Sequence, residues 1–106
     1  MGKMQRDKGA RFEREIVKQL DLHEIESKRV PLSGATWLKG DVIAKINNEE
    51  FVFELKKRAD GFKQIYDWSR DVDALIIGAD RKKPIICMDL DDFCDLLKGG
   101  KNGRSL

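Results

Sequence analysis

The chain has 106 residues, of which 41% are hydrophobic and 38% are charged, and its formal net charge is +2. This length supports one modest core, so we expect a single domain over residues 1–98 and a flexible C-terminal tail at 99–106. No apolar run approaches the roughly 20 residues that cross a bilayer, and the N-terminus lacks the apolar core of a signal peptide. We therefore expect a cytoplasmic protein rather than a membrane-spanning or secreted one.

The first predicted element is a helix over residues 7–22, in which Ile16, Val17 and Leu20 recur at helical spacing. Glu13 occupies the first position of this apolar stripe, so its carboxylate should face or border the core. Residues 1–18 also hold six Lys or Arg side chains against three acidic ones. Such a patch can bind nucleic acid, but a solvated helix face has the same composition.

A short strand is predicted at 26–30 and a loop at 31–40, and two apolar runs then flank Asn47-Asn48. Asparagine suits a tight hairpin turn, and a two-residue turn pairs Ile46 with Glu49, so that paired residue numbers sum to 95. Asp41 then stands opposite Glu54. A three-residue turn would split the apolar residues between both faces, so burial argues against it.

Side chains alternate between the faces of a strand, and this hairpin has two unlike faces. Asp41 and Glu54 share one face with Lys56. The other face is entirely apolar and consists of Val42, Ala44, Ile46, Phe51, Phe53 and Leu55. We expect helices to cover this apolar face.

The remaining elements are a short helix around Phe62, Ile65 and Tyr66, strands within 73–80 and 83–89, and a final helix at 89–98 that the next glycines end. The order α, β, β, β, α, β, β, α predicts an α/β fold with a central mixed sheet and flanking helices. Cys87 and Cys94 cannot build a zinc site with the single His23, because zinc sites need about four ligands. We expect both cysteines to be buried free thiols.

Two carboxylates that face each other repel unless a cation lies between them, and Mg²⁺ prefers oxygen ligands. Lys56 on the same face can hold a water molecule or neutralise charge that develops on a phosphate. Asp41, Glu54 and Lys56 together are therefore suited to phosphodiester hydrolysis. Taken alone the pattern is weak, because a small structural domain with a solvated hairpin face has it too.

Four ordered motifs make the signal specific: "KGARFERE" at 8–15, "KRVPLSGA" at 28–35, "GDVIA" at 40–44 and "FELKK" at 53–57. Through them residues 8–58 resemble the PD-(D/E)xK nuclease superfamily, and most closely its archaeal-type Holliday junction resolvase branch with the phage relatives of that branch. One departure is Gly40, which stands where the superfamily has proline. The resemblance implies a restriction-endonuclease-like core.

The resemblance also implies the site residues. The catalytic residues would be Glu13, Asp41, Glu54 and Lys56, and Mg²⁺ (or Mn²⁺ in its place) would be held by Glu13, Asp41, Glu54 and the carbonyl of Leu55. DNA phosphates would meet Arg14, Arg29 and Ser33, and Lys8, Arg11, Lys57 and Arg58 would continue the phosphate path. Trp37 could stack on a base or pack against protein, and neither Trp37 nor His23 receives a role.

We expect a Mg²⁺-dependent, structure-selective DNA endonuclease, a Holliday junction resolvase that acts as a homodimer without an organic cofactor or a membrane. If a phage encodes it, it would work in the host cytoplasm. The alternatives are a nuclease that cuts flaps, nicks or duplex DNA, and a non-catalytic DNA-binding module. Two facing carboxylates argue against a pure binder, because they repel phosphate. An apolar patch of Phe62, Ile65 and Tyr66 is the expected dimer surface.

Overall fold

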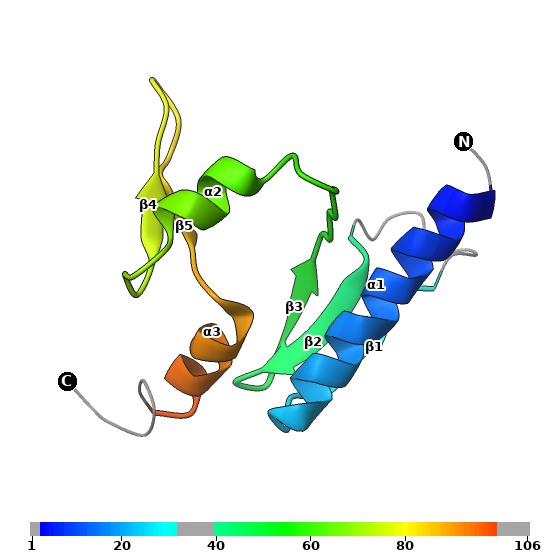
Figure 1. The fold of residues 1–106 in the computed structure, drawn as a ribbon. Coiled ribbons are helices and arrows are strands. Elements are labelled where there is room, and N and C mark those ends of the chain that lie inside the picture. Colours follow the sequence, from blue (N-terminus) through cyan, green and yellow to red (C-terminus); the bar gives the residue numbers. More distant parts are fainter. Residues whose placement is uncertain (1–2, 32–39, 100–106) are drawn as a thin grey trace. The chain divides into compact units, whose positions relative to one another are not determined.

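The computed structural model describes residues 3–31 and 40–99, and these form two compact units, Met1–Lys57 and Arg58–Leu106 (Figure 1). Each unit is considered by itself below, and the expectation of a single domain stays a prediction. None of the described helices combines the length and the apolar composition that a membrane span requires.

The first unit consists of α1 (Lys3–Leu22) and the antiparallel strands β1 (Ser27–Arg29), β2 (Val42–Ile46) and β3 (Glu49–Phe53), in the sheet order β1-β2-β3. The helix begins four residues before its predicted start and lies along β1 (Figure 1). Its apolar stripe is buried at Leu20, which is 0% exposed, and Val42, Ala44 and Ile46 of β2 are buried as well. The core of this unit therefore lies between α1 and one face of the sheet.

The register of the β2–β3 hairpin is the one that the residue arithmetic predicted. Ile46 pairs with Glu49 and Val42 pairs with Phe53, so the sum of 95 holds along the whole ladder. Asn47 and Asn48 both adopt positive φ, at 54° and 67°, which a tight two-residue hairpin turn requires. The turn residues therefore set which side chains share a face.

Coverage of the apolar face differs between its two strands. The β2 residues are buried, whereas Phe51 of β3 is 45% exposed and stacks on Phe53 with 6.0 Å between ring centroids. The expectation of a fully covered face is thus wrong for β3. The reason is its position: β3 is an edge strand of this sheet, while β2 is central.

The hairpin is irregular where β2 begins. The carbonyl of Phe53 accepts a hydrogen bond from the amide of Asp41 at 2.8 Å, although Phe53 is the register partner of Val42. Two consecutive residues therefore face one, as in a β-bulge, and the predicted pairing of Asp41 with Glu54 is not part of the ladder, which ends at Val42 and Phe53. Gly40 precedes the bulge with φ of +131°, and a Cβ there would collide with Cγ1 of Val52. Proline fixes φ near −65°, so it could not take this backbone conformation.

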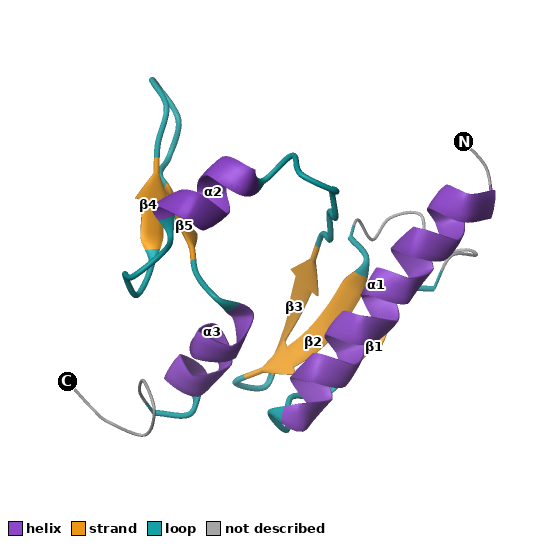
Figure 2. Cartoon of the chain, viewed as in Figure 1, coloured by secondary structure: helices purple, strands orange, loops and turns teal. Residues whose placement is uncertain are grey.

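The second unit consists of α2 (Lys63–Trp68), the antiparallel hairpin β4 (Leu75–Ile77) and β5 (Ile85–Cys87), and α3 (Leu90–Leu97) (Figure 2). Asp89 caps α3, because its Oδ1 accepts from the amide of Asp91 at 2.8 Å. Gly99 follows α3 at φ of +121° and donates its amide to the carbonyl of Leu96, a common way to end a helix.

The cysteines of this unit are both free, as expected, but only one is buried. Cys94 is 0% exposed, and Cys87 is half-buried at the end of β5. Burial, together with the negative charges of Asp91 and Asp95, raises the pKa of the Cys94 thiol. The Cys94 thiol therefore stays protonated at neutral pH and is a packing group rather than a nucleophile.

The predicted element order and the α/β class are confirmed. The described strands form two sheets, β1-β2-β3 and β4-β5. All strand pairs among residues 3–31 and 40–99 are antiparallel. Tyr66, expected at the dimer surface, and Trp68 are 75% and 56% exposed and thus do not belong to the core.

Candidate active site

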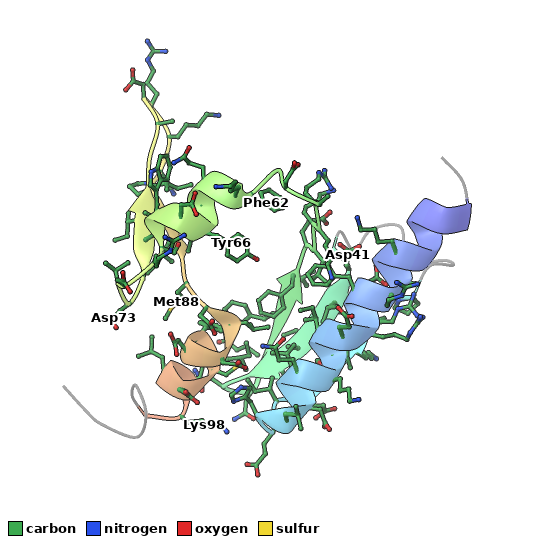
Figure 3. All side chains as sticks on the ribbon, viewed as in Figure 1. Asp41, Phe62, Tyr66, Asp73, Met88 and Lys98 are labelled. Atoms are coloured by element: carbon green, nitrogen blue, oxygen red, sulfur yellow. The ribbon has the colours of Figure 1, made fainter. Side chains whose placement is uncertain are left out.

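Asp41 lies at the open end of the first hairpin, where β2 begins (Figure 3). Its Oδ2 accepts a hydrogen bond from the backbone amide of Leu55 at 2.8 Å. Leu55 stands between Glu54 and Lys56 in the chain. The bond therefore fixes the Asp41 carboxylate against the predicted Glu-Leu-Lys segment, just beyond the last ladder pair of the hairpin.

Glu54 and Lys56 form an ion pair, with Nζ of Lys56 3.3 Å from Oε2 of Glu54. Residues two apart in an extended chain point to the same side, which this contact requires. Both side chains are more than half exposed, so the pair itself adds little stability. It holds an acid and a base together on a surface that a solvent-borne substrate can reach.

The site prediction requires Glu13 to lie with Asp41 and Glu54, but the residue that it contacts is Arg29. Its Oε1 lies 2.8 Å from Nε of Arg29, and the Glu13 side chain is only 19% exposed. Arg29 pairs with Val42 in the sheet, so both are on the face that α1 covers. The prediction that Glu13 borders the core is confirmed. Among the described residues its polar contact is Arg29, and no recorded contact joins it to Asp41 or Glu54.

The other predicted DNA-binding residues are spread over α1 and the segment after β3. Lys8, Arg11, Arg14 and Arg58 are exposed. Lys57 lies 3.6 Å from Oε1 of Glu15, and its Nζ lies 5.0 Å from the centroid of the Phe12 ring, so it packs against α1. His23 is half-buried. Ser33, Trp37 and Lys39 fall outside the described residues.

The donor chemistry of Asp41, Glu54 and Leu55 suits Mg²⁺, because carboxylate and carbonyl oxygens are hard ligands. Within the described part of the chain, no group of three or more His, Cys, Asp or Glu side chains is arranged so that it could hold a metal ion. This is compatible with Mg²⁺, which is commonly held by one or two carboxylates together with waters and substrate phosphates. The two acidic residues and one carbonyl therefore fit such an ion.

Sequence reasoning missed a groove between α1 and β1. This open groove of about 440 Å³ is lined by Arg14, Val17, Lys18, Asp21, Ser27, Lys28 and Arg29. The available signal was the spacing: 14, 17, 18 and 21 follow the i, i+3, i+4, i+7 pattern of one helix stripe. Lys18 is one of the six Lys or Arg residues within 1–18, and the sequence pattern gave it no individual role.

The chain matches a known protein family. The model of the archaeal Holliday junction resolvase (Hjc) family matches residues 4–91, which includes all the described residues of the candidate site. Neither a curated protein nor a solved structure matches the chain.

Proposed function

Since the chain belongs to the archaeal Holliday junction resolvase family, which indicates a nuclease of DNA junctions, we propose that it is a Mg²⁺-dependent endonuclease that nicks four-way junctions as a homodimer. One observation carries the proposed site: the hydrogen bond from the Leu55 amide to Asp41. This bond brings an aspartate to a Glu-x-Lys segment from which it is 14 positions distant in sequence.

Asp41, Glu54 and the Leu55 carbonyl would hold the ion. A bound Mg²⁺ supplies a Lewis acid for the phosphoryl oxygen and lowers the pKa of a coordinated water. The chain's contribution is to keep these oxygens in place. The Leu55 amide satisfies one oxygen of Asp41, which leaves Oδ1 available as a ligand.

Lys56 would orient the attacking water and stabilise the charge on the phosphate. Its present contact with Glu54 places its Nζ beside an acid that is also a proposed ligand. With a cation held at Glu54, the attraction of that carboxylate for Lys56 would weaken. The ammonium can then turn to a substrate oxygen, because both side chains are exposed and free to reorient.

Glu13 would complete the site only after it leaves Arg29. A phosphate is a strong bidentate partner for a guanidinium, so a DNA backbone bound at Arg29 competes with Glu13 for it. The released Glu13 carboxylate would then bind the ion or one of its waters. Substrate binding and site completion are thereby coupled in this proposal.

A dimer would supply two matching sites for the two nicks that resolve a junction with approximate two-fold symmetry. Tyr66 supports α2 as the contact, since an aromatic side chain that is 75% exposed is unusual on an isolated protein surface. Tyr66→Ser should shift sedimentation toward the monomer. Lys63→Gln, on the same helix, should leave sedimentation unchanged, and a dimer that persists in Tyr66→Ser would contradict this contact.

The test of the activity uses a labelled four-way junction and a linear duplex of matched sequence, each with Mg²⁺ or with EDTA. We expect paired nicks in the junction only, and none in EDTA. Asp41→Asn and Glu54→Gln should each lower the cleavage rate about a hundredfold or more, because even outer-shell changes at metal sites cost 10- to 100-fold. Asp80→Asn, an exposed aspartate outside the site, is the matched control.

The outcomes separate the classes of function. Cutting of both substrates would retain the site and discard junction selectivity. Junction binding without cleavage in Mg²⁺ or Mn²⁺ would make the protein a binding module. Full activity in Asp41→Asn would show that the hairpin end is not the active site.

A further inference from the structure

The groove between α1 and β1 is cationic on both of its walls. Arg14 and Lys18 line it from the helix, and Arg29 lines it from the strand, while Lys28 borders it with a side chain that points to the opposite face of the sheet. Asp21 is the single acid among its lining residues. Arg14 and Lys18 are one helical turn apart, about 6 Å along the axis at 1.5 Å per residue. The groove therefore runs along the helix from the Arg29 end toward the C-terminus of α1.

The strand wall also offers main-chain donors. The amide of Val30 donates to the carbonyl of Asp41 at 2.9 Å, and the amide of Lys45 donates to the carbonyl of Glu26 at 2.8 Å. Hydrogen-bonded positions alternate in an antiparallel ladder, so residues 26, 28 and 30 point their main chain toward β2. Ser27 and Arg29 point theirs to the opposite side. Since β1 is at the edge of its sheet, their amides are directed outward, where the groove lies.

We propose that this groove binds the sugar-phosphate backbone of one arm of the DNA substrate, with Lys18 as a phosphate contact that positions the arm and takes no part in the reaction. The proposal rests on the proposed function, because Arg14 and Arg29 connect the groove to the candidate site. Lysine side chains and outward-directed amides are both common phosphate partners in DNA complexes.

The charge of the groove favours a nucleic acid over an added peptide strand. An edge strand can accept a peptide through its free amides, but it then needs pockets for alternate side chains. Here the neighbouring side chains are the cations Arg14, Lys18 and Arg29, of which Arg29 is paired with Glu13, and cations suit a regularly charged backbone. Asp21 lies one turn beyond Lys18, at the last turn of α1, where the helix dipole also disfavours anions. Asp21 would therefore mark the end of the phosphate track.

The first experiment measures junction and duplex affinity in EDTA, so that cleavage plays no part, over a series of salt concentrations. Each phosphate contact contributes about 0.9 to the slope of log K against log salt on duplex DNA. Lys18→Gln should reduce the slope by about that amount, and Lys28→Gln should reduce it less, because the Lys28 side chain points to the other face of the sheet. Glutamine keeps the helix propensity of lysine at position 18. Lys98→Gln, an exposed cation in the other unit, should leave the slope unchanged.

The second experiment looks for a gain of affinity, which misfolding cannot produce. Asp21→Asn removes the one acid from the groove, and its recorded hydrogen bond is made by the main chain and survives the change. We expect DNA binding to tighten about two- to fivefold, the range for one exposed charge interaction. Glu24→Gln makes the same change in net charge at an exposed position outside the lining and should have a smaller effect.

Failure of this proposal and failure of the proposed function are distinguishable. If the unmodified protein binds the junction but Lys18→Gln and Asp21→Asn keep its slope and affinity, the groove is not a DNA contact, and the nuclease proposal stands. The groove is likewise not a DNA contact, and the nuclease proposal stands, if a polyglutamate peptide binds the groove while Lys18→Gln and Asp21→Asn bind DNA as the unmodified protein does. If the unmodified protein binds neither junction nor duplex, both proposals are wrong.

Discussion

The two hairpins of this chain have the same antiparallel topology but unlike surfaces. In β2–β3 the side chains alternate, β2 is buried on one face, and charged residues gather at the open end. In β4–β5 both strands are continuously apolar, and Ile76, Ile85 and Ile86 are each at least 60% exposed. The first pattern is that of a scaffold that presents chemistry. The second is that of a surface with exposed apolar side chains and without catalytic groups on its strands. Such a surface is suited to contact another protein surface.

The turns of the hairpins differ as well. Asn47-Asn48 is a two-residue turn in which both φ angles are positive, whereas residues 78–84 form a longer connection between β4 and β5. Tight turns dictate register, and longer loops tolerate changes in length at small entropic cost. The three predictions below test this contrast, beginning with the largest expected effect.

Insertion of one glycine between Asn47 and Asn48 should reduce junction cleavage about a hundredfold or more. A one-residue slip moves side chains to the other face, so Asp41 would no longer meet the Glu-Leu-Lys segment. A glycine inserted between Arg81 and Lys82 is the control, and it should leave cleavage within about twofold. Equal losses from both insertions would show that the turn at 47–48 has no special role in the site.

Gly40→Ala should destabilise the protein by about 1–3 kcal/mol, since a left-handed backbone and a collision with Val52 both oppose a side chain there. Gly78→Ala, which meets nothing within 4 Å, should change the free energy of unfolding by no more than about 0.5 kcal/mol. Urea unfolding followed by circular dichroism measures both. Equal stability of the two variants would contradict the bulge geometry at Asp41.

Asp89→Ala should have the smallest effect, a loss of about 1 kcal/mol, because it removes the cap of α3 and leaves the amide of Asp91 without its acceptor. The second unit should be affected without a change in the proposed metal-binding residues of the first. Asp80→Ala, in the loop between β4 and β5, is the control. A cleavage defect in Asp89→Ala that exceeds the loss of folded protein would show that α3 influences the site directly.

The sequence predicted those features that depend on counting residues. The hairpin register follows from two asparagines and an alternating pattern, and the position of Glu13 follows from the helical period. The bulge at Asp41 was not predictable. It depends on the φ of Gly40 and on the hydrogen bond that the amide of Asp41 donates to the carbonyl of Phe53. The Glu13–Arg29 pair was not predictable either, since periodicity indicates the face of a residue but not its partner on the next element.

The short sequence separations within the candidate site have a consequence for how it folds. Asp41 and Leu55 are 14 positions apart, and Glu13 and Arg29 are 16 apart, so each contact closes a short loop. A hairpin of this size forms in roughly 1–10 μs. The carboxylates of the hairpin should thus meet early, and the helix–strand pair should form as a separate local event. We then expect the slow step of folding to be the docking of the hairpin onto the helix–strand pair. Mutations in the apolar stripe of α1, rather than in the hairpin, should therefore change the rate at which refolding restores activity.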